Sequence, residues 1–419
     1  MDKKYTLVSL FSGAGGMDLG FKLAGFDILW ANDFNLDATI TYKNNIGDHV
    51  VHGDVKSIES CDIPDNPDVI IGGFPCQGFS IANTKRSMED KRNFLYKEML
   101  RVIADKKPKI FVAENVKGIL SMQQGKVVQM IKKDFEMLGY IVDIKILNAA
   151  EYGVPQARER VIFMGNRIGS ENKFPIRTHS NNGLEEQIAI DTMQENSYIN
   201  SNVVRNPEPF KTTEETIGFL ANIKLSDNEF NVGDRKIYNH IAYENVSDKF
   251  WGRKYHVNQE EICDYLKHWR NISGWSTKKI DEHFGYKHTA GHWFRKDNKS
   301  GSIPKPEDWW ELKKILGFDD KYDKQVTEFV EKTIVFEQSL RITNWDRPSD
   351  TITATGPEIH VNKMRRLSVR ECAMLQTFPA NFVFYGSMNS MYKQVGNAVP
   401  VQLAKQIATC VKDMLEEQE

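Results

Sequence analysis

The first 166 residues repeat one pattern, in which a short apolar run with β-propensity ends in a polar or reactive side chain. The runs cover residues 5–10, 27–31, 49–52, 69–71 and 110–113. The groups that follow the last four runs are Asp33, Asp54, Cys76 and Glu114. In an open α/β sheet, ligands bind at the edge formed by the carboxyl ends of the strands. The pattern therefore predicts a doubly wound α/β domain with its site at that edge.

A glycine-rich turn, Phe11-Ser12-Gly13-Ala14-Gly15-Gly16, follows the first run and leads into helical spacing up to Ala24. Strand, glycine turn and helix is the order of a nucleotide-type loop, because glycines admit a ligand and the helix N-terminus offers free N–H groups. Asp33 lies about twenty residues further on, where an acidic group meets ribose hydroxyls in dinucleotide folds. A turn that serves only tight packing is the alternative.

A lone cysteine follows the fourth run, in the stretch Gly72-Gly73-Phe74-Pro75-Cys76-Gln77-Gly78-Phe79-Ser80. Pro75 fixes one backbone angle, and the glycines allow a sharp turn close to another molecule. Free thiols have a pKa of about 8.5, so a nucleophilic cysteine needs surroundings that favour the thiolate. A buried structural cysteine is the alternative.

Two arginines, Arg158 and Arg160, precede the apolar run 161–165. Because they alternate, they share one face of an extended strand. A pair of solvated surface arginines is the alternative. Between Glu114 and these arginines, apolar spacing predicts helices over 96–105 and 127–138 and a strand over 141–147.

The composition of the chain gives broad limits on its number of domains, its partners and its cellular compartment. A chain of 419 residues is long enough for two or three domains, and 27% charged residues with a formal net charge of -2 give no global sign of nucleic-acid binding. The five cysteines are odd in number and scattered, which favours a reducing compartment over a disulfide framework. No signal peptide or membrane-length apolar run is found. We therefore expect a cytoplasmic protein.

Six stretches together resemble the cytosine-C5 DNA methyltransferases and follow the order of that family's motifs. They are Phe11 to Gly20, Gly72 to Ser80, Glu114-Asn115-Val116, Gln156-x-Arg158-x-Arg160, Arg365 to Cys372, and Gly396-Asn397-Ala398-Val399-Pro400. Phe74 replaces the proline often found before Pro-Cys, and Ser368 stands where threonine is usual. Neither residue touches reacting atoms, so neither weakens the resemblance.

The resemblance implies a chemistry for these residues. Cys76 would add to C6 of cytosine and so make C5 nucleophilic, while Glu114 would hydrogen-bond to or protonate N3. Arg158 would hold O2 of the base and orient the acid, Asn115 would shape the loop, and Arg160 would support the site. The target cytosine must leave the stacked duplex to reach them.

The resemblance also implies S-adenosyl-L-methionine as the cofactor and no metal. Phe11 and the Gly13 to Gly16 backbone would surround the methionine part, with Asp33 at the ribose and Asp54 at the adenine. The other residues expected around the cofactor are Ser12, Ala14, Val55, Pro75, Leu95, Asn397 and Val399. A last helix over about 401–416 would pack beside the first helix, and Asn397 is also a candidate helix N-cap.

The middle of the chain has no βα alternation and reads as a second, smaller domain for target recognition. We expect the catalytic domain to cover 1–166, completed by 365–419, and the recognition domain to cover 167–364. Six of the eight tryptophans fall in the middle segment, most of them as expected core residues. They are Trp251, Trp269, Trp275, Trp293, Trp309 and Trp310.

Residues 276–286 have the capped helix and glycine of the first half of a helix-turn-helix, with a second helix expected from His288. We place this unit at about 258–318. A zinc site on Cys263, His283, His288 and His292 is the weaker interpretation, because the spacing fits no compact ligand pattern.

The sequence thus indicates a Rossmann-like methyltransferase that transfers methyl from S-adenosyl-L-methionine to C5 of a flipped-out cytosine in double-stranded DNA. By family analogy it would be a monomeric bacterial enzyme that protects host DNA beside a restriction endonuclease acting on the same site. Three alternatives stay open: an RNA cytosine methyltransferase, a catalytically silent DNA-binding regulator, and a nicotinamide-dependent oxidoreductase, in which Cys76 and Glu114 would have no role.

Overall fold

The computed structural model describes residues 4–75, 95–181, 198, 203–244, 259–285, 306–330, 341–354 and 357–418. The chain forms two compact units. The first comprises Met1–Ile241, Asn344–Thr355 and Ser368–Glu419, and the second comprises Ala242–Thr343 and Gly356–Leu367. Residues 167–241 therefore belong to the first unit. The division into units does not identify the residues that recognise DNA, so the recognition role of 167–364 stays a prediction.

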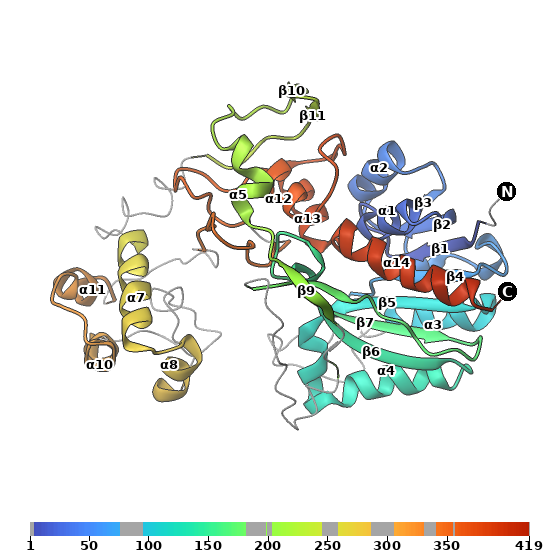
Figure 1. The fold of residues 1–419 in the computed structure, drawn as a ribbon, viewed down its shortest axis with the longest axis horizontal. Coiled ribbons are helices and arrows are strands. Elements are labelled where there is room, and N and C mark those ends of the chain that lie inside the picture. The colour runs from blue at the N-terminus through green and yellow to red at the C-terminus, as the bar shows by residue number, and fades with distance from the viewer. Residues whose placement is uncertain are drawn as a thin grey trace. The chain divides into compact units, whose positions relative to one another are not determined.

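A seven-stranded mixed sheet forms the centre of the first unit (Figure 1). Its strands are β1 (Thr6–Leu10), β2 (Asp27–Asp33), β3 (Val50–His52), β4 (Val69–Gly72), β5 (Ile110–Val116), β6 (Ile141–Asn148) and β7 (Glu159–Asn166). They follow the order β3-β2-β1-β4-β5-β7-β6, and helices cover the sheet. The predicted doubly wound α/β fold is confirmed, and each apolar run in the first 166 residues forms or overlaps a strand.

Strand β7 runs antiparallel to both neighbours, β5 and β6. Its first residues therefore lie at the edge where the parallel strands end, and Arg160 is paired with Val116 at the end of β5. The reversal of this one strand brings the two arginines to the same edge as Asp33 at the end of β2 and Glu114 near the end of β5.

The helices of the first unit are α1 (Gly16–Leu23), α2 (Leu36–Asn45), α3 (Leu95–Lys106), α4 (Lys126–Glu136), α5 (Thr213–Ile217), α12 (Val369–Leu375), α13 (Met388–Asn397) and α14 (Val401–Glu416). Helices α3 and α4 confirm the two predicted from apolar spacing. Local sequence sets several helix starts. Asn35, for example, caps α2 by accepting a hydrogen bond from the Ala38 N–H.

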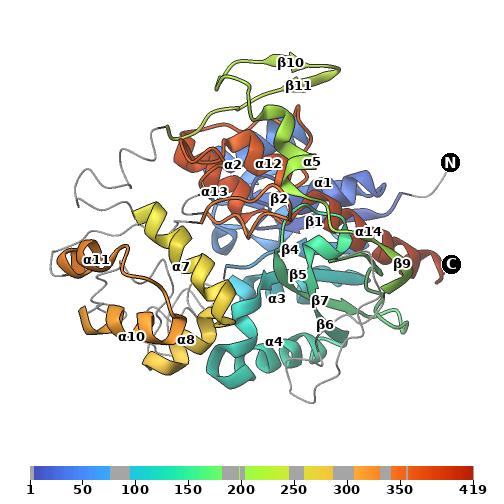
Figure 2. The same ribbon diagram turned by 60° about the vertical axis from the view of Figure 1, so that its left-hand side comes forward.

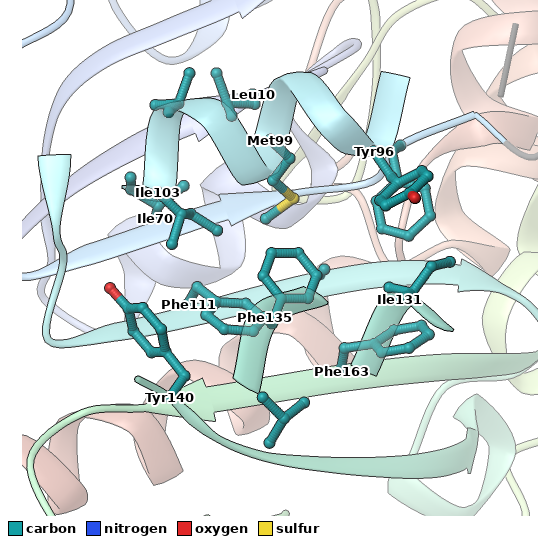
Figure 3. Packing of buried hydrophobic residues seen from close by; sticks show 14 of the residues in the cluster. Leu10, Ile70, Tyr96, Met99, Ile103, Phe111, Ile131, Phe135, Tyr140 and Phe163 are labelled. Atoms are coloured by element: carbon teal, nitrogen blue, oxygen red, sulfur yellow. The ribbon is translucent and has the colours of Figure 1, made fainter. Parts of the chain in front are cut away.

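One hydrophobic core lies between the central strands and helices α3 and α4 (Figure 3). Every residue of β4 is buried, and so are all residues of β5 except Val116. This is expected for central strands that are covered on both faces. Phe111 of β5 stacks on Phe135 of α4 with ring centroids 4.3 Å apart. Tyr96, Met99 and Ile103 close the core from α3. This packing fixes the strands whose ends carry the site.

Helix α14 packs along α1, so the two ends of the chain build one unit (Figures 1 and 2). The contact is close because glycines of α1 face it. A Cβ at Gly20 would lie 2.5 Å from Ala404 Cβ, and one at Gly16 would lie 2.6 Å from the Val399 carbonyl oxygen. The predicted packing of the last helix beside the first is confirmed.

We expect Gly20→Ala to destabilise the protein by about 1–3 kcal/mol, because the added methyl group overpacks the contact between α1 and α14. Gly118→Ala is the matched control, since a Cβ there would meet no atom within 4 Å. Denaturant unfolding of both variants measures the difference. Equal stabilities would mean that α14 moves away from α1 at little cost.

Two small strand pairs and a set of buried bonds complete the first unit. Strands β8 (Arg177–Ser180) and β9 (Val203–Pro209) are parallel, and β10 (Phe230–Val232) pairs with β11 (Arg235–Ile237) as an antiparallel hairpin.

Arg370 is fully buried and donates to the carbonyls of Tyr238 and Pro379 at 2.7 and 2.9 Å. This guanidinium ties the segment after β11 to the segment before α13.

The second unit contains a helical cluster of α7 (Gln259–Ser273), α8 (Thr277–Phe284), α10 (Pro306–Leu316) and α11 (Asp323–Val330). Trp309 is fully buried in its core, where Trp269 and Trp275 pack partly buried, whereas Trp310 is exposed. Trp251 and Trp293 lie outside the described residues. Most of the tryptophans that the structure describes here are thus core residues, as predicted.

Helix α8 confirms the first helix of the predicted helix-turn-helix. Ser276 caps it by accepting from the Lys279 N–H, and Gly285 ends it in the left-handed conformation. The expected second helix from His288 lies outside the described residues, as do His288 and His292 of the weaker zinc interpretation. Among the residues described, no helix has the length and apolar character needed to cross a membrane.

Candidate active site

The glycine turn and five predicted site residues, Asp33, Glu114, Asn115, Arg158 and Arg160, lie at one edge of the seven-stranded sheet. The glycine turn follows β1, Asp33 ends β2, Gly73 follows β4, and Glu114 and Asn115 lie near the end of β5. Arg158 and Arg160 flank the first residue of β7. Cys76 lies outside the described residues, which reach Pro75 from the strand side. Its position at this edge therefore stays a prediction.

The glycine turn takes a backbone shape that few residues other than glycine adopt. Gly13 and Gly15 have φ values of 55° and 86°, and Phe11 has a φ of 55°. For a phenylalanine this is a costly conformation of the kind that clusters at functional sites. A Cβ at Gly13 would meet nothing within 4 Å, so the turn leaves open space beside its backbone.

Asp33 connects the glycine turn to the end of β2. Its Oδ2 accepts from the Gly13 N–H at 2.8 Å, and its Oδ1 accepts from the Asn35 N–H at 2.8 Å. The carboxyl group is buried, and burial raises its pKa, although the two N–H groups and His52 act in the opposite direction. The structure therefore holds an acidic side chain against the open backbone of Gly13.

Phe34 is a candidate that sequence reasoning missed. It follows Asp33 directly, and 70% of its surface is exposed. An aromatic ring left in solvent beside an acidic group is suited to stacking on a flat ring of a ligand. The signal in the sequence was the large apolar residue after Asp33, where the strand pattern had already ended.

The residues after β3 divide between the surface and the core. Asp54 is exposed and caps a short 3₁₀ helix by accepting from the Lys56 N–H at 3.1 Å, whereas Val55 is buried in the core. Open glycine backbone, the carboxylate of Asp33 and the ring of Phe34 thus provide polar and flat surfaces at one edge. This set fits a nucleoside-containing ligand with ribose hydroxyls.

Glu114 lies at the centre of a second group of contacts. Its Oε1 is 2.7 Å from Arg160 Nε, although the Nε–H bond does not point straight at the oxygen, and both side chains are largely buried. A Cβ at Gly73 would lie 3.0 Å from Glu114 Oε2, so the turn after β4 passes close to the carboxyl group. Asn115 Nδ2 donates to the Phe74 carbonyl at 2.9 Å. The chain that leads to Cys76 is therefore held against Glu114 and Asn115.

The two arginines have different partners in the structure. The guanidinium paired with Glu114 belongs to Arg160, while the fully buried Arg158 donates to the carbonyls of Ile352 and Gly396 at 2.8 and 2.7 Å. Burial and the charge of Arg160 lower the pKa of Arg158. The role of orienting the acid, predicted for Arg158, therefore suits Arg160 better, because the Arg158 side chain is directed to backbone oxygens of two later segments.

Gln156 also joins these segments. It is fully buried, and its Oε1 accepts from the Ile352 N–H at 3.1 Å. Ser349 exchanges backbone hydrogen bonds with this stretch, donating to the Pro155 carbonyl at 3.0 Å and accepting from the Ala157 N–H at 2.8 Å. The Gln-x-Arg-x-Arg stretch thus binds the late segment 349–352 to the sheet.

The remaining predicted cofactor residues differ in exposure. Pro75 and Leu95 are half-buried, Val399 is buried with its carbonyl against Gly16, and Asn397 is exposed. Asn397 is the last residue of α13, and the N-cap of α14 is Pro400. The N-cap prediction for Asn397 is therefore wrong. The proline side chain has no hydrogen-bond acceptor, so α14 starts without a side-chain cap.

Comparison with known proteins agrees with this arrangement. The model of the family described as C-5 cytosine-specific DNA methylase matches residues 5–413. The chain is 33% identical over 425 residues to the type II methyltransferase M.NgoFVII of Neisseria gonorrhoeae, covering 99% of this chain and 89% of that protein. It is 32% identical to M.FnuDI of Fusobacterium nucleatum, covering 99% and 96% of the two chains.

A solved structure shares the fold. It is a prophage-encoded protein of E. coli described as a DNA modification methyltransferase, with a TM-score of 0.56 and 23% sequence identity. The likeness covers 99% of this chain and 100% of that one. At this identity the likeness concerns the fold alone.

Proposed function

The chain belongs to the C-5 cytosine-specific DNA methylase family and is a DNA (cytosine-5-)-methyltransferase, and from this premise we propose how its residues carry out the reaction. The target cytosine is flipped out of the duplex and enters the edge of the sheet beside Glu114. The observation that carries this proposal is the contact of Glu114 with Arg160 and with the turn that leads to Cys76.

Cys76 and Glu114 activate the ring together. The Cys76 thiolate forms a bond to C6, and the electron pair displaced from the C5–C6 double bond makes C5 nucleophilic. Charge that would collect at N3 is relieved by a hydrogen bond or proton from the Glu114 carboxyl group. C5 then accepts the methyl group. Loss of the C5 proton to a base and of the sulfur from C6 restores the ring.

The contacts around Glu114 assign supporting roles. Arg160 orients the carboxyl group, and we expect its guanidinium to donate a hydrogen bond to O2 of the base as well. Asn115 holds the carbonyl of Phe74 and so positions the loop of Cys76. Arg158 keeps the segments around Ile352 and Gly396 in place and acts on the site through them.

The methyl donor that fits the other half of the edge is S-adenosyl-L-methionine, which supplies a methyl group bound to a positively charged sulfur. The Gly13 to Gly16 backbone would hold its methionine part, beside Phe11, Ser12 and Ala14. Asp33 would accept hydrogen bonds from the ribose hydroxyls, Phe34 would stack on the adenine, and Asp54 would lie at the rim. Pro75, Leu95, Asn397 and Val399 complete the site.

We expect Asp33→Ala to weaken S-adenosyl-L-methionine binding by about 10- to 100-fold, since hydrogen bonds to a charged group contribute about 1.5–3 kcal/mol. The variant also releases the Gly13 N–H from its partner. Calorimetric titration in the absence of DNA measures the affinity. Asp62→Ala, which removes an exposed carboxylate elsewhere, should bind as the wild type does. Unchanged affinity in Asp33→Ala would contradict the ribose role.

Double-stranded DNA is the proposed substrate, and the middle of the chain is the proposed reader of its sequence. Acidic residues outnumber basic ones in the described helices α7, α8, α10 and α11. Residues 286–305 carry Lys287, Arg295, Lys296, Lys299 and Lys305 against a single Asp297. Phosphate contacts require positive charge, so this stretch is the part of the middle segment best suited to DNA.

We propose the role of this enzyme in the cell by analogy with relatives named as type II methyltransferases. The enzyme would act as a monomer in the bacterial cytoplasm and protect host DNA from an endonuclease that cuts the same site. These relatives do not favour the RNA or regulator alternatives.

Base-resolution mapping of 5-methylcytosine in DNA from cells that express the protein tests the function. We expect methylation at one cytosine of a short recurring sequence, and none in cells that express an empty vector. Methyl groups found on RNA alone, or on N4 of cytosine, would overturn the proposal.

A further inference from the structure

A buried hydrogen-bond chain lies directly beneath the glycine turn, and no step proposed so far uses it. Asp18, in the first turn of α1, is fully buried, and its Oδ1 accepts from the Tyr42 hydroxyl at 3.0 Å. The same hydroxyl lies 3.0 Å from His49 Nε2. The chain thus joins α1, α2 and the start of β3.

The ring of Tyr42 supports the turn itself. A Cβ at Gly15 would lie 2.8 Å from Tyr42 Cδ2, so the ring packs directly on the Gly15 backbone together with Ile46. Gly15 is the N-cap residue of α1 and has no side chain to cap the helix. The position of this turn therefore depends on the residues that pack below it.

The hydroxyl of Tyr42 has one proton and two partners. When the Asp18 carboxyl group is ionised, Tyr42 donates to it and accepts from the His49 Nε2–H. When Asp18 is protonated, its carboxyl group can itself donate a hydrogen bond. Tyr42 can then accept from Asp18 and donate to His49 Nε2. The charge of Asp18 can thus affect the glycine turn through the side chain of Tyr42.

We propose that Tyr42 is a positioning residue for the methyl-donor site, holding the glycine turn through its ring on Gly15 and its hydroxyl between Asp18 and His49. The inference rests on the proposed binding of S-adenosyl-L-methionine at this turn. It adds residues that touch the turn from below and do not touch the donor.

The groups around the chain set its response to pH. Burial raises the pKa of Asp18 to about 6, the charge of Asp33 on β2 adds to this, and the hydroxyls of Ser9 and Tyr42 and its own backbone N–H oppose it. Ser9 lies beside the carboxyl group without closing a hydrogen bond of good geometry.

At the other end of the chain, burial and the charge of Lys22 lower the pKa of His49, while Asp27 and Asp48 raise it. The two shifts favour the neutral form of each end group. Because the folded-state pKa of Asp18 lies above its ordinary value, falling pH protonates it near 6 and removes the anion that Tyr42 serves. Donor affinity should then fall.

The test compares S-adenosyl-L-methionine affinity in Tyr42→Phe and the wild type by calorimetry from pH 5.5 to 8, without DNA. We expect about five- to tenfold weaker binding at pH 7.5, as for loss of one buried hydrogen bond, with kcat at saturating donor changed less than KM. Tyr140→Phe is the matched control, because this buried tyrosine donates to the Pro108 carbonyl at 2.7 Å, outside the chain.

A second variant, Asp18→Asn, keeps an oxygen for Tyr42 but does not titrate. It should lose the part of the pH dependence near 6 that the wild type shows, whereas the part due to Asp33 stays. If Tyr42→Phe does not fold, His49→Gln removes the outer partner from a half-exposed position and should weaken binding in the same direction.

The outcomes separate the two proposals. Wild-type protein that does not bind S-adenosyl-L-methionine contradicts the proposed function. Wild type that binds, with Tyr42→Phe or His49→Gln of equal affinity and equal pH profile, overturns the role of Tyr42 alone.

Discussion

Cys76→Ser should abolish methyl transfer while the protein still binds S-adenosyl-L-methionine and DNA. A serine hydroxyl has a pKa far above that of a thiol, so almost none of it is ionised near neutral pH and it adds poorly to C6. Transfer of radiolabelled methyl to DNA measures the loss. Cys61→Ser, which changes an exposed cysteine, is the control and should keep full activity.

DNA with 5-fluorocytosine at the target position gives an independent readout of the same step. Fluorine at C5 blocks the final elimination, so the wild type should remain covalently attached through Cys76. The serine variant should form no adduct. A serine variant with a normal rate would exclude nucleophilic addition by this residue.

Glu114→Gln should slow methyl transfer by about 10²–10⁴-fold, the usual contribution of a general acid. The amide cannot give a proton to N3, and it also replaces the carboxyl group that Arg160 contacts. Single-turnover rates at saturating DNA measure the chemical step. Donor affinity should change little, because the donor residues lie at the ends of other strands.

Glu159→Gln is the matched control for this variant. Glu159 lies between the two arginines in sequence, but it is half-exposed and pairs with Lys117 at 2.9 Å on the surface. We expect it to keep a rate close to that of the wild type. A Glu114→Gln variant that loses donor affinity and keeps its rate would reverse the roles assigned to Glu114 and Asp33.

Much of the fold could be predicted because its signals are local. Each strand of the first 166 residues is a short apolar run, and the glycine turn needs positive φ values that the sequence supplies at Gly13 and Gly15. Helix α8 could be placed within a residue, since Ser276 caps it and Gly285 ends it. The edge that carries the site follows from the order of strands and polar groups.

The division between Arg158 and Arg160 could not be predicted in the same way. Two residues that alternate on a strand share a face, and only the antiparallel pairing of β7 with β5 decides which one meets Glu114. The partners of Arg158, Ile352 and Gly396, are about two hundred residues away in sequence. Contacts over such separations depend on how the late segments pack.

The chain of Asp18, Tyr42 and His49 was hidden for a related reason. Asp18 comes from α1, Tyr42 from α2 and His49 from the residue before β3, and no local spacing in the sequence connects them. Only the packing of α2 on the glycine turn shows that the tyrosine ring lies under Gly15. Phe34 was missed because the strand pattern drew attention to Asp33 and not to the exposed ring after it.

The contact between α1 and α14 has a consequence for how this protein is made. At about 5–20 residues per second, the ribosome needs about 20–80 seconds after releasing α1 before it has added α14. Throughout this interval the face of α1 around Gly20 has no α14 to cover it. The nascent chain must therefore keep this surface of α1 from aggregating until synthesis reaches residue 416.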